Sequence, residues 1–139
     1  MAKTSGLALT ALSVDDSAGA VKDIRNDITN FQFATPRAVQ DVTGVDKSAM
    51  ERLLLLADFS ITLNGVFNDS ANQAHAVFKT VPSTSVQRTT TITVTGTVGA
   101  NTLAPEVLYT DYPLTRAQDG ALTFAVPGVL ANGTVPTWS

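Results

Sequence analysis

The chain has 139 residues, of which 44% are hydrophobic and 15% charged, the composition of one globular domain rather than of a disordered chain. A net charge of −3 excludes a basic surface for phosphates, and the lack of cysteine excludes disulfides and thiolate metal sites. The apolar run Leu53–Ala57 is far shorter than the roughly 20 residues that span a bilayer, and the N-terminal segment lacks a signal-peptide pattern, so we expect a soluble protein.

Thr and Val are abundant, with 20 and 15 copies, whereas Lys and Glu are few. Side chains branched at Cβ fit a pleated sheet, so the sequence predicts a mainly β protein. A first strand is expected over Leu7–Val14, followed by a turn at Asp15–Gly19. Ala20–Ile28 fits either a short helix or a bulged strand, and Thr29–Pro36 fits a strand that Pro36 ends.

Arg37–Arg52 shows only scattered order and is long for a connection, and such segments are usually functional or disordered. Strict alternation begins at Ala57 and predicts a strand with one apolar and one polar face. Asn64-Gly65 is expected to form a tight turn or a bulge. The apolar face comprises Ala57, Phe59, Ile61 and Leu63, and the polar face comprises Asp58, Ser60, Thr62 and Asn64.

One helix is expected, over about residues 70–80. Asp69 or Ser70 can cap it, and Ser70 with Gln73 matches the capping-box pattern. Its apolar residues form a single stripe at helical spacing, which predicts that the helix packs against the outside of a sheet.

Three further strands are expected in the second half of the chain, over Gln87–Gly96, Pro105–Leu114 and Ala121–Val126. The last two are predicted to be neighbours, with a turn at Asp119-Gly120 between them. The remaining tail is rich in Gly and Pro and is interpreted as an ordered arm rather than a strand.

The sequence contains no clear pattern of catalytic or metal-binding residues. Its only histidine, His75, has no second ligand at metal-site spacing, so we interpret it as structural or surface-exposed. Asp15 and Asp16 are adjacent in a predicted turn, where their side chains diverge into solvent. Glycine patterns for phosphate binding or a nucleophile elbow do not occur. We therefore expect no enzyme, no metal and no cofactor.

Two aromatic residues, Tyr112 and Trp138, lie in Pro-rich segments without clear periodicity. Trp138 is either loosely attached or packed on another surface. We expect it to pack on a neighbouring subunit, and Tyr112 is the second candidate for such a contact.

The order and spacing of several segments resemble one protein family. The segment "DVTGVDKSAMER" leads into "FSITLNGVFND", the helix "AHAVF" follows, and "TTTITVTG" and "DGALTFAVPG" come later. In this order they are similar to the major tail protein, or tail tube protein, of bacteriophages with long non-contractile tails, especially phages of actinobacterial hosts. The resemblance covers roughly Leu7–Trp138. Leu53–Leu56 departs from it, because a shorter link containing glycine would be expected there.

The resemblance implies a single domain over residues 1–139, a β-sandwich or half-barrel of antiparallel strands with one flanking helix. It implies that six copies form a ring whose inner sheets join into one barrel, and that rings stack into the tail tube of a virion. Such tubes surround a tape-measure protein, meet tail-end proteins and later conduct double-stranded DNA. The chain would then be a structural protein made in the host cytoplasm.

The family's architecture also suggests roles for individual residues. A long loop over about residues 37–52 would contact the next ring, and its candidate residues are Val39, Asp41, Val42, Thr43, Gly44, Val45, Asp46 and Lys47. The polar side of the following strand would line the channel, with Asp58, Ser60 and Thr62 as candidates. A nearly neutral lining would let DNA phosphates slide past.

Two other functions stay open at the level of sequence. One is a β-sandwich binding module of a phage baseplate or adhesin, which would recognise a partner through its loops. The other is a small hydrolase that uses His75 and an aspartate. Self-assembly distinguishes the tube subunit from both.

Overall fold

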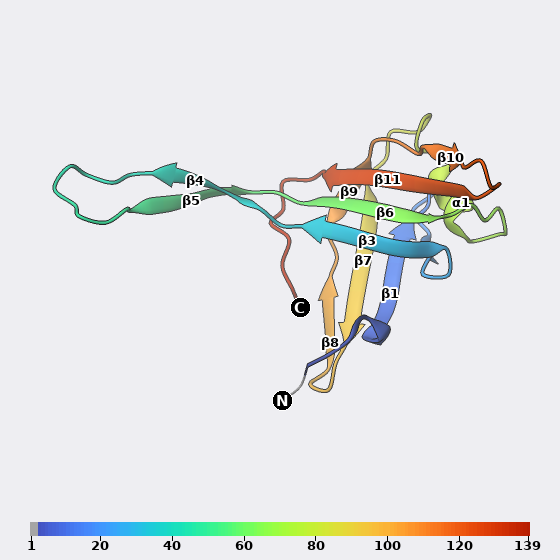
Figure 1. Ribbon diagram of the computed structural model, residues 1–139, viewed down its shortest axis with the longest axis horizontal. Coiled ribbons are helices and arrows are strands. Elements are labelled where there is room, and N and C mark those ends of the chain that lie inside the picture. The colour runs from blue at the N-terminus through green and yellow to red at the C-terminus, as the bar shows by residue number, and fades with distance from the viewer. Residues whose placement is uncertain (1–2) are drawn as a thin grey trace.

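The computed structural model describes residues 3–139 (Figure 1). Within this range the chain is mainly β with one short α-helix, as predicted. In chain order the elements are η1 (Gly6–Ala8), β1 (Leu9–Asp15), β2 (Val21–Asp23), β3 (Ile28–Ala34), β4 (Arg37–Asp41), β5 (Arg52–Ala57), β6 (Ser60–Val66), α1 (Ala74–Phe78), β7 (Arg88–Thr95), β8 (Ala100–Leu103), β9 (Glu106–Tyr109), β10 (Leu114–Arg116) and β11 (Leu122–Leu130).

Nine strands form one antiparallel sheet in the order β2-β1-β7-β9-β11-β6-β3, with β8 also beside β7 and β10 also beside β11. In Figure 1, β1, β7 and β8 run across the direction of β3, β6 and β11, so the sheet folds over on itself. β9 joins the halves, because it pairs with β7 at one end and with β11. This is the predicted sandwich or half-barrel.

The apolar core lies between the two halves of the sheet, and α1 closes one end of it. Phe78 of α1 packs edge-on against Tyr109 of β9, with 5.4 Å between ring centroids, and lies 6.0 Å from Phe124 of β11. The helix therefore caps the core, which corrects the prediction that it packs on the outside of a sheet. The core consists of Leu12, Val14, Ile24, Phe59, Ile61, Leu63, Ala74, Val77, Phe78, Ile92, Leu103, Val107, Tyr109, Phe124 and Val126.

The helix is shorter than predicted and is capped differently. It has five residues, and the side chain of its N-cap residue, Gln73, makes no capping hydrogen bond within the described chain. The predicted caps at Asp69 and Ser70 are therefore wrong. Instead the buried Asp27 accepts a hydrogen bond of 2.8 Å at Oδ2 from the backbone N–H of Ala74. A carboxylate at this end complements the partial positive charge of the first turn.

β6 follows the predicted alternation. Phe59, Ile61 and Leu63 are buried in the core, whereas Ser60 and Thr62 are exposed on the other side of the sheet. Because successive side chains of a strand point to opposite faces, the sequence pattern alone was sufficient to orient this strand.

Asn64-Gly65 makes no turn, and both residues stay within β6. A bulge does lie here, but on β3, where the register shifts between Ile28 and Asn30. A Cβ on Gly65 would lie 2.7 Å from Cζ of Phe124, so this position needs glycine because of close packing rather than because of a turn.

Arg37–Arg52 is not the irregular loop that the sequence predicts. Its first five residues form β4, which pairs with β5, and only residues 42–51 form the connecting loop. This ribbon continues the β3–β6 pair past a joint at which Asp58 N–H donates to the carbonyl of Pro36 (2.9 Å). Figure 1 shows the ribbon projecting far from the body. We call residues 37–57 the arm.

The last strands differ partly from expectation. The Asp119-Gly120 turn is confirmed, with Gly120 at φ +98°, but it joins β10 to β11, and the predicted strand over Pro105–Leu114 is split into β9 and β10. Both parts pair with β11. The tail was predicted to be an ordered arm rather than a strand, and this is wrong for residues 127–130, which belong to β11. Farther on, Ser139 and Thr102 exchange backbone hydrogen bonds of 2.9 and 3.2 Å beside β8.

The turn predicted at Asp15–Gly19 is confirmed over residues 16–19. Asp15 itself ends β1, and its Oδ1 is buried, which corrects the prediction that its side chain points into solvent. Asp16 Oδ1 accepts hydrogen bonds of 2.9 Å from the N–H groups of Ala18 and Ala20. Both bonds lower the pKa of the Asp16 carboxyl group, and the bond from Ala20 has the larger effect. Ala20–Ile28 forms a strand, β2, and a turn rather than a helix.

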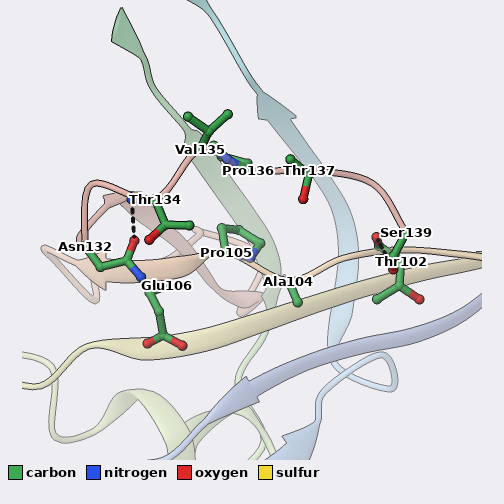
Figure 2. Close-up of a pocket in the computed structure, with 10 residues that line it drawn as sticks. All are labelled: Thr102, Ala104, Pro105, Glu106, Asn132, Thr134, Val135, Pro136, Thr137 and Ser139. Carbon is green, nitrogen blue, oxygen red and sulfur yellow. Dashed lines mark hydrogen bonds between the residues drawn. The ribbon is translucent and has the colours of Figure 1, made fainter.

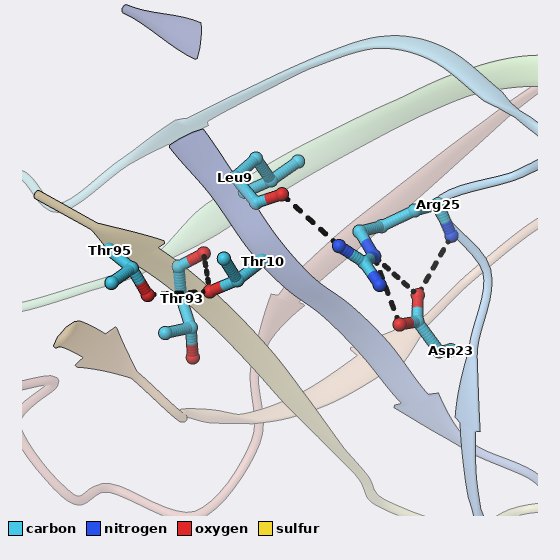
Figure 3. Close-up of polar contacts among 6 residues, drawn as sticks. All are labelled: Leu9, Thr10, Asp23, Arg25, Thr93 and Thr95. Carbon is cyan, nitrogen blue, oxygen red and sulfur yellow. Dashed lines mark hydrogen bonds and ion pairs between the residues drawn. The ribbon is translucent and has the colours of Figure 1, made fainter. Parts of the chain in front are cut away.

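Polar contacts fasten β1 at its start (Figure 3). Arg25 forms an ion pair of 3.0 Å with Asp23 and donates to the carbonyl of Leu9 (3.2 Å). On the other side of β1, the hydroxyls of Thr10 and Thr95 lie 2.9 Å apart. The strands of this half are therefore joined by side chains as well as by the backbone ladder.

Candidate assembly surfaces

Several large apolar side chains are exposed along the arm. All four leucines of Leu53–Leu56 are exposed, Leu56 at 86%, and Val39 on β4 is also exposed. A two-stranded ribbon is only marginally stable alone in water, and contiguous exposed apolar side chains mark interaction surfaces. The arm therefore has the properties of a docking element.

The eight residues predicted to contact the next ring lie along the arm and in its loop. The loop is organised around Thr43, whose Oγ1 accepts from Glu51 N–H (2.8 Å) and lies 2.7 Å from Asp41 Oδ1. The hydrogen bonds that Thr43 donates to Asp41 lower the pKa of the Asp41 carboxyl group. The bond from the Thr43 side chain has the larger effect, and the bond from its backbone N–H the smaller. The loop thus has a defined backbone that presents the fully exposed Val45.

The predicted channel residues are only partly brought together. Ser60 and Thr62 share the outer face of β6, whereas Asp58 precedes the strand at the root of the arm, where its Oδ1 accepts a hydrogen bond of 2.7 Å from Phe59 N–H. A shallow hollow of about 460 Å³ runs along β3 and β6 on the side of Ser60 and Thr62.

The outer face of β3, β6 and β11 is uncharged. The register aligns Ser60, Thr62 and Asn64 with partners on both neighbouring strands. Asn64 Nδ2 donates to Asn30 Oδ1 across the strands (2.7 Å). The rows of this face are Ala34–Ser60–Val129, Gln32–Thr62–Pro127 and Asn30–Asn64–Ala125, and none of these residues carries a charge. Such a surface hydrogen-bonds to water without holding phosphates.

Tyr112 and Trp138 both have partners within the chain. Tyr112 is half-buried against Phe124, with ring centroids 5.6 Å apart, and its hydroxyl lies 3.1 Å from His75 Nδ1. Burial raises the pKa of Tyr112. The ring centroids of Trp138 and Phe33 lie 6.0 Å apart, and the Trp138 residue is 54% exposed. Contact with a neighbouring subunit stays a prediction for both, and Trp138 offers more free surface for it.

A further hollow, of about 270 Å³, lies between the C-terminal segment and the start of β9 (Figure 2). Glu106 is the one acidic side chain among the residues that line it, and it contacts the hydroxyl of Thr89. The wall includes a turn in which Thr134 N–H donates to Asn132 Oδ1 (3.1 Å).

His75 also belongs to the packing rather than to a reactive cluster. Its ring lies 4.7 Å from that of Phe67 and next to Tyr112. In residues 3–139 no three His, Cys, Asp or Glu side chains gather where they could hold a metal ion. None of the helices described is long and apolar enough to cross a membrane.

Two solved structures share this fold over nearly the whole chain. One is a chain of the tail of an empty gene transfer agent particle, determined with helical refinement and C6 symmetry, with a TM-score of 0.69, 16% identity, and coverage of 99% of this chain and 98% of that chain. The other belongs to the virion of a native gene transfer agent particle, with a TM-score of 0.68, 15% identity and 99% coverage of both chains. No protein-family model matches the chain, and no curated protein matches its sequence. The fold is thus one found in the tail of a virion-like particle.

Proposed function

We propose that this chain is a structural protein of a phage-type virion, the subunit of its tail tube, in which six copies form a ring and rings stack. The observation that carries this proposal is the full-length structural likeness to a chain of a sixfold-symmetric tail. The sequence resemblance to phage tail tube proteins, which rests on different evidence, agrees with it. The solved neighbours are parts of tail and virion particles, which supports a non-enzymatic role.

The open sheet edges support closure into a ring. Among the described strands, β3 pairs only with β6, and β10 pairs only with β11. Uncovered edges are templates for pairing with another chain. β3 of one copy beside β10 of the next would continue the sheet around a ring, a heterologous contact that closes after a fixed number of copies. The edge of β8, by contrast, is covered by the C-terminal segment.

The uncharged outer face of β3, β6 and β11 supports the channel. In a ring closed through β3 and β10 this face would line the lumen, with Ser60 and Thr62 toward the centre and Asp58 near the rim. A tape-measure protein during assembly, and double-stranded DNA afterwards, would pass over hydroxyl and amide groups without lasting ion pairs. The arms would then make the axial contacts between rings.

Electron microscopy of the purified chain tests this proposal. Negatively stained samples, prepared over a range of concentrations and followed by sedimentation, should contain rings or tubes with sixfold symmetry. A chain that stays monomeric even at high concentration would contradict the proposal and favour a baseplate or adhesin binding module. In phage particles, antibodies to the chain should label the whole length of the tail.

A further inference from the structure

The sequence contains two Asn-Gly pairs, and the fold places them in opposite surroundings. Asn64-Gly65 lies within β6, whereas Asn132-Gly133 lies in a turn after β11. In such a pair the backbone nitrogen of glycine can attack the side-chain carbonyl of its own asparagine, because glycine has no side chain to obstruct the approach. The rate of this reaction depends on how easily the backbone brings the two groups together.

Asn64-Gly65 is held in extended backbone that must bend before the attack can occur. Gly65 is buried and is paired on both sides, with Phe124 of β11 and Ile28 of β3. The amide nitrogen of Asn64 also donates to Asn30 Oδ1 (2.7 Å), so the group that would leave is already bound. The reaction at Asn64 would require this part of β6 to leave the sheet.

Asn132-Gly133 has none of these restraints. Both residues are exposed, Gly133 has φ +73°, and a Cβ added to Gly133 would meet nothing within 4 Å. Among residues 3–139 no backbone acceptor takes the Gly133 N–H, so the attacking group gives up no such bond. Thr134 N–H donates to Asn132 Oδ1 (3.1 Å). A donor at this oxygen stabilises the negative charge that develops there during the attack.

We propose that Asn132 is a self-modification site, where spontaneous deamidation of the folded chain loosens the C-terminal segment, and that Asn64 is protected. The Gly133 nitrogen gives its proton to hydroxide and forms a bond to Cγ of Asn132. The bond from Cγ to Nδ2 breaks, and Nδ2 takes a proton from water and leaves as ammonia. Water then opens the succinimide ring that has formed. Opening at Cγ gives aspartate, and opening at the main-chain carbonyl gives isoaspartate, in which the main chain runs through Cγ. This reaction needs only water and the folded chain, whether or not tubes form.

The modified turn lies between two attachments of the C-terminal segment. Before it, Ala131 N–H donates to the carbonyl of Glu106 (3.0 Å), and after it Ser139 exchanges backbone hydrogen bonds with Thr102 of β8. Residues 132–137 lie over the hollow between these attachments (Figure 2). Isoaspartate lengthens the main chain here by one carbon, which shifts the segment and weakens the bonds of Ser139. β8 would then present a further open edge.

Peptide mapping of aged protein tests the modification. The purified chain is kept for several weeks at mildly alkaline pH and physiological temperature and is then digested with trypsin. Mass spectrometry locates the mass gain that marks the replacement of the amide by an acid. Asn132 is the only asparagine in the peptide that follows Arg116, and its deamidation should be at least tenfold faster than that of Asn64. Equal rates, or an Asn132 that stays unmodified, would overturn the inference.

The same incubation in denaturant is the matched control. Without the fold neither Asn-Gly pair is restrained, so the rates at Asn64 and Asn132 should become similar. A difference of tenfold that persists in denaturant would mean that the neighbouring sequence rather than the fold selects Asn132, and would also contradict the inference.

The only tryptophan reports the effect on the C-terminal segment. Trp138 packs on Phe33 of β3, so its fluorescence should shift to longer wavelength as isoaspartate accumulates and the segment detaches. Asn132→Asp introduces the same charge without lengthening the main chain and should keep the parent emission. Asn132→Gln, whose attack would form a larger ring, should keep it through the whole incubation. Constant emission after most of Asn132 has been converted would show that the segment is not loosened and would overturn that part of the inference.

Discussion

At the scale of single residues, a buried cation ties three segments together. Arg88 is almost fully buried, and all its hydrogen-bond partners are neutral. Nη1 donates to the carbonyls of Asp15 (3.0 Å) and Val77 (3.1 Å), and Nη2 donates to Thr80 Oγ1 (2.8 Å). Burial lowers the pKa of the guanidinium. Because a buried charge needs hydrogen-bond partners, these three bonds fix the end of β1 against α1.

Asp27 is expected to stabilise the fold through its cap on α1. Asp27→Ala should lower the free energy of unfolding by about 1–3 kcal/mol, because it leaves the buried N–H of Ala74 without an acceptor. Denaturant unfolding followed by circular dichroism measures the difference. The control is Asp69→Ala, which removes the exposed carboxylate of one of the two predicted cap residues and should change stability little. Equal losses in both variants would contradict the assignment of Asp27.

Tyr109 should make the protein sensitive to alkaline pH. Burial raises its pKa far above the usual value, and its hydroxyl lies 2.6 Å from that of Thr90. Because the folded-state pKa is raised, the stabilisation is complete below the unfolded pKa of about 10 and is lost as pH rises above it. The free energy of unfolding should fall there by about 1.4 kcal/mol per pH unit from this group. Tyr109→Phe should remove this part of the slope and leave the part from Tyr112, whose pKa burial also raises. An unchanged slope would mean that Tyr109 does not contribute.

At the scale of elements, the sequence pattern correctly predicted strands that are buried on one face and exposed on the other. β6 is covered on one side, so its alternation identified the buried Phe59, Ile61 and Leu63. The cap of α1 could not be predicted, because Asp27 lies 47 positions before Ala74 and only the folded sheet brings them together. The helix was predicted to begin too early for the same reason. The cap residues that the sequence offers, Asp69 and Ser70, do not cap the helix, which begins at Ala74.

The arm was missed for a different physical reason. Its loop is organised by bonds between Asp41, Thr43 and Glu51 that no periodicity reveals. The four leucines then break alternation, and a continuous apolar run cannot be told from a link between elements by sequence pattern alone. Among the candidate channel residues, Ser60 and Thr62 follow from alternation, but Asp58 lies outside β6 because the strand pair is interrupted at Pro36.

The arm should be dispensable for folding but required for assembly. Arg37 and Ala57 are partners across the ribbon, so residues 38–56 can be replaced by the two-residue turn Asn-Gly. The shortened chain should keep its circular dichroism spectrum and unfolding midpoint, because the core includes no residue of the arm. It should form no tubes in electron micrographs. Tubes of normal length from the shortened chain would contradict the axial role of the arm.

At the scale of the whole molecule, one long hairpin takes part in all three proposed contacts. Residues 28–66 run out along β3 and β4 and return along β5 and β6. β3 presents the open edge, β6 presents the uncharged face, and the arm projects beyond both (Figure 1). The rest of the sheet and α1 bury the apolar side of this hairpin and so hold its orientation. In the proposed tube, ring closure, channel lining and stacking would therefore be coupled through this one hairpin.

The orientation of the uncharged face can be tested in assembled tubes. Ser60→Lys combined with Thr62→Lys should spare folding, because both side chains are exposed, and should place a belt of positive charge in every ring. Tubes of this variant should retain short double-stranded DNA at low salt and release it as salt rises, with affinity falling about a thousandfold or more between roughly 50 and 200 mM. Thr95→Lys with Thr97→Lys adds the same charge at two exposed positions, one at the end of β7 and one just after it, and gives up the contact between Thr95 and Thr10. DNA held inside the tube should be protected from nuclease in the first variant, whereas DNA on the outer wall of the second should be degraded. Equal nuclease sensitivity would mean that Ser60 and Thr62 face away from the channel. The ring closed through β3 and β10 would then have this face on its outside rather than toward the lumen.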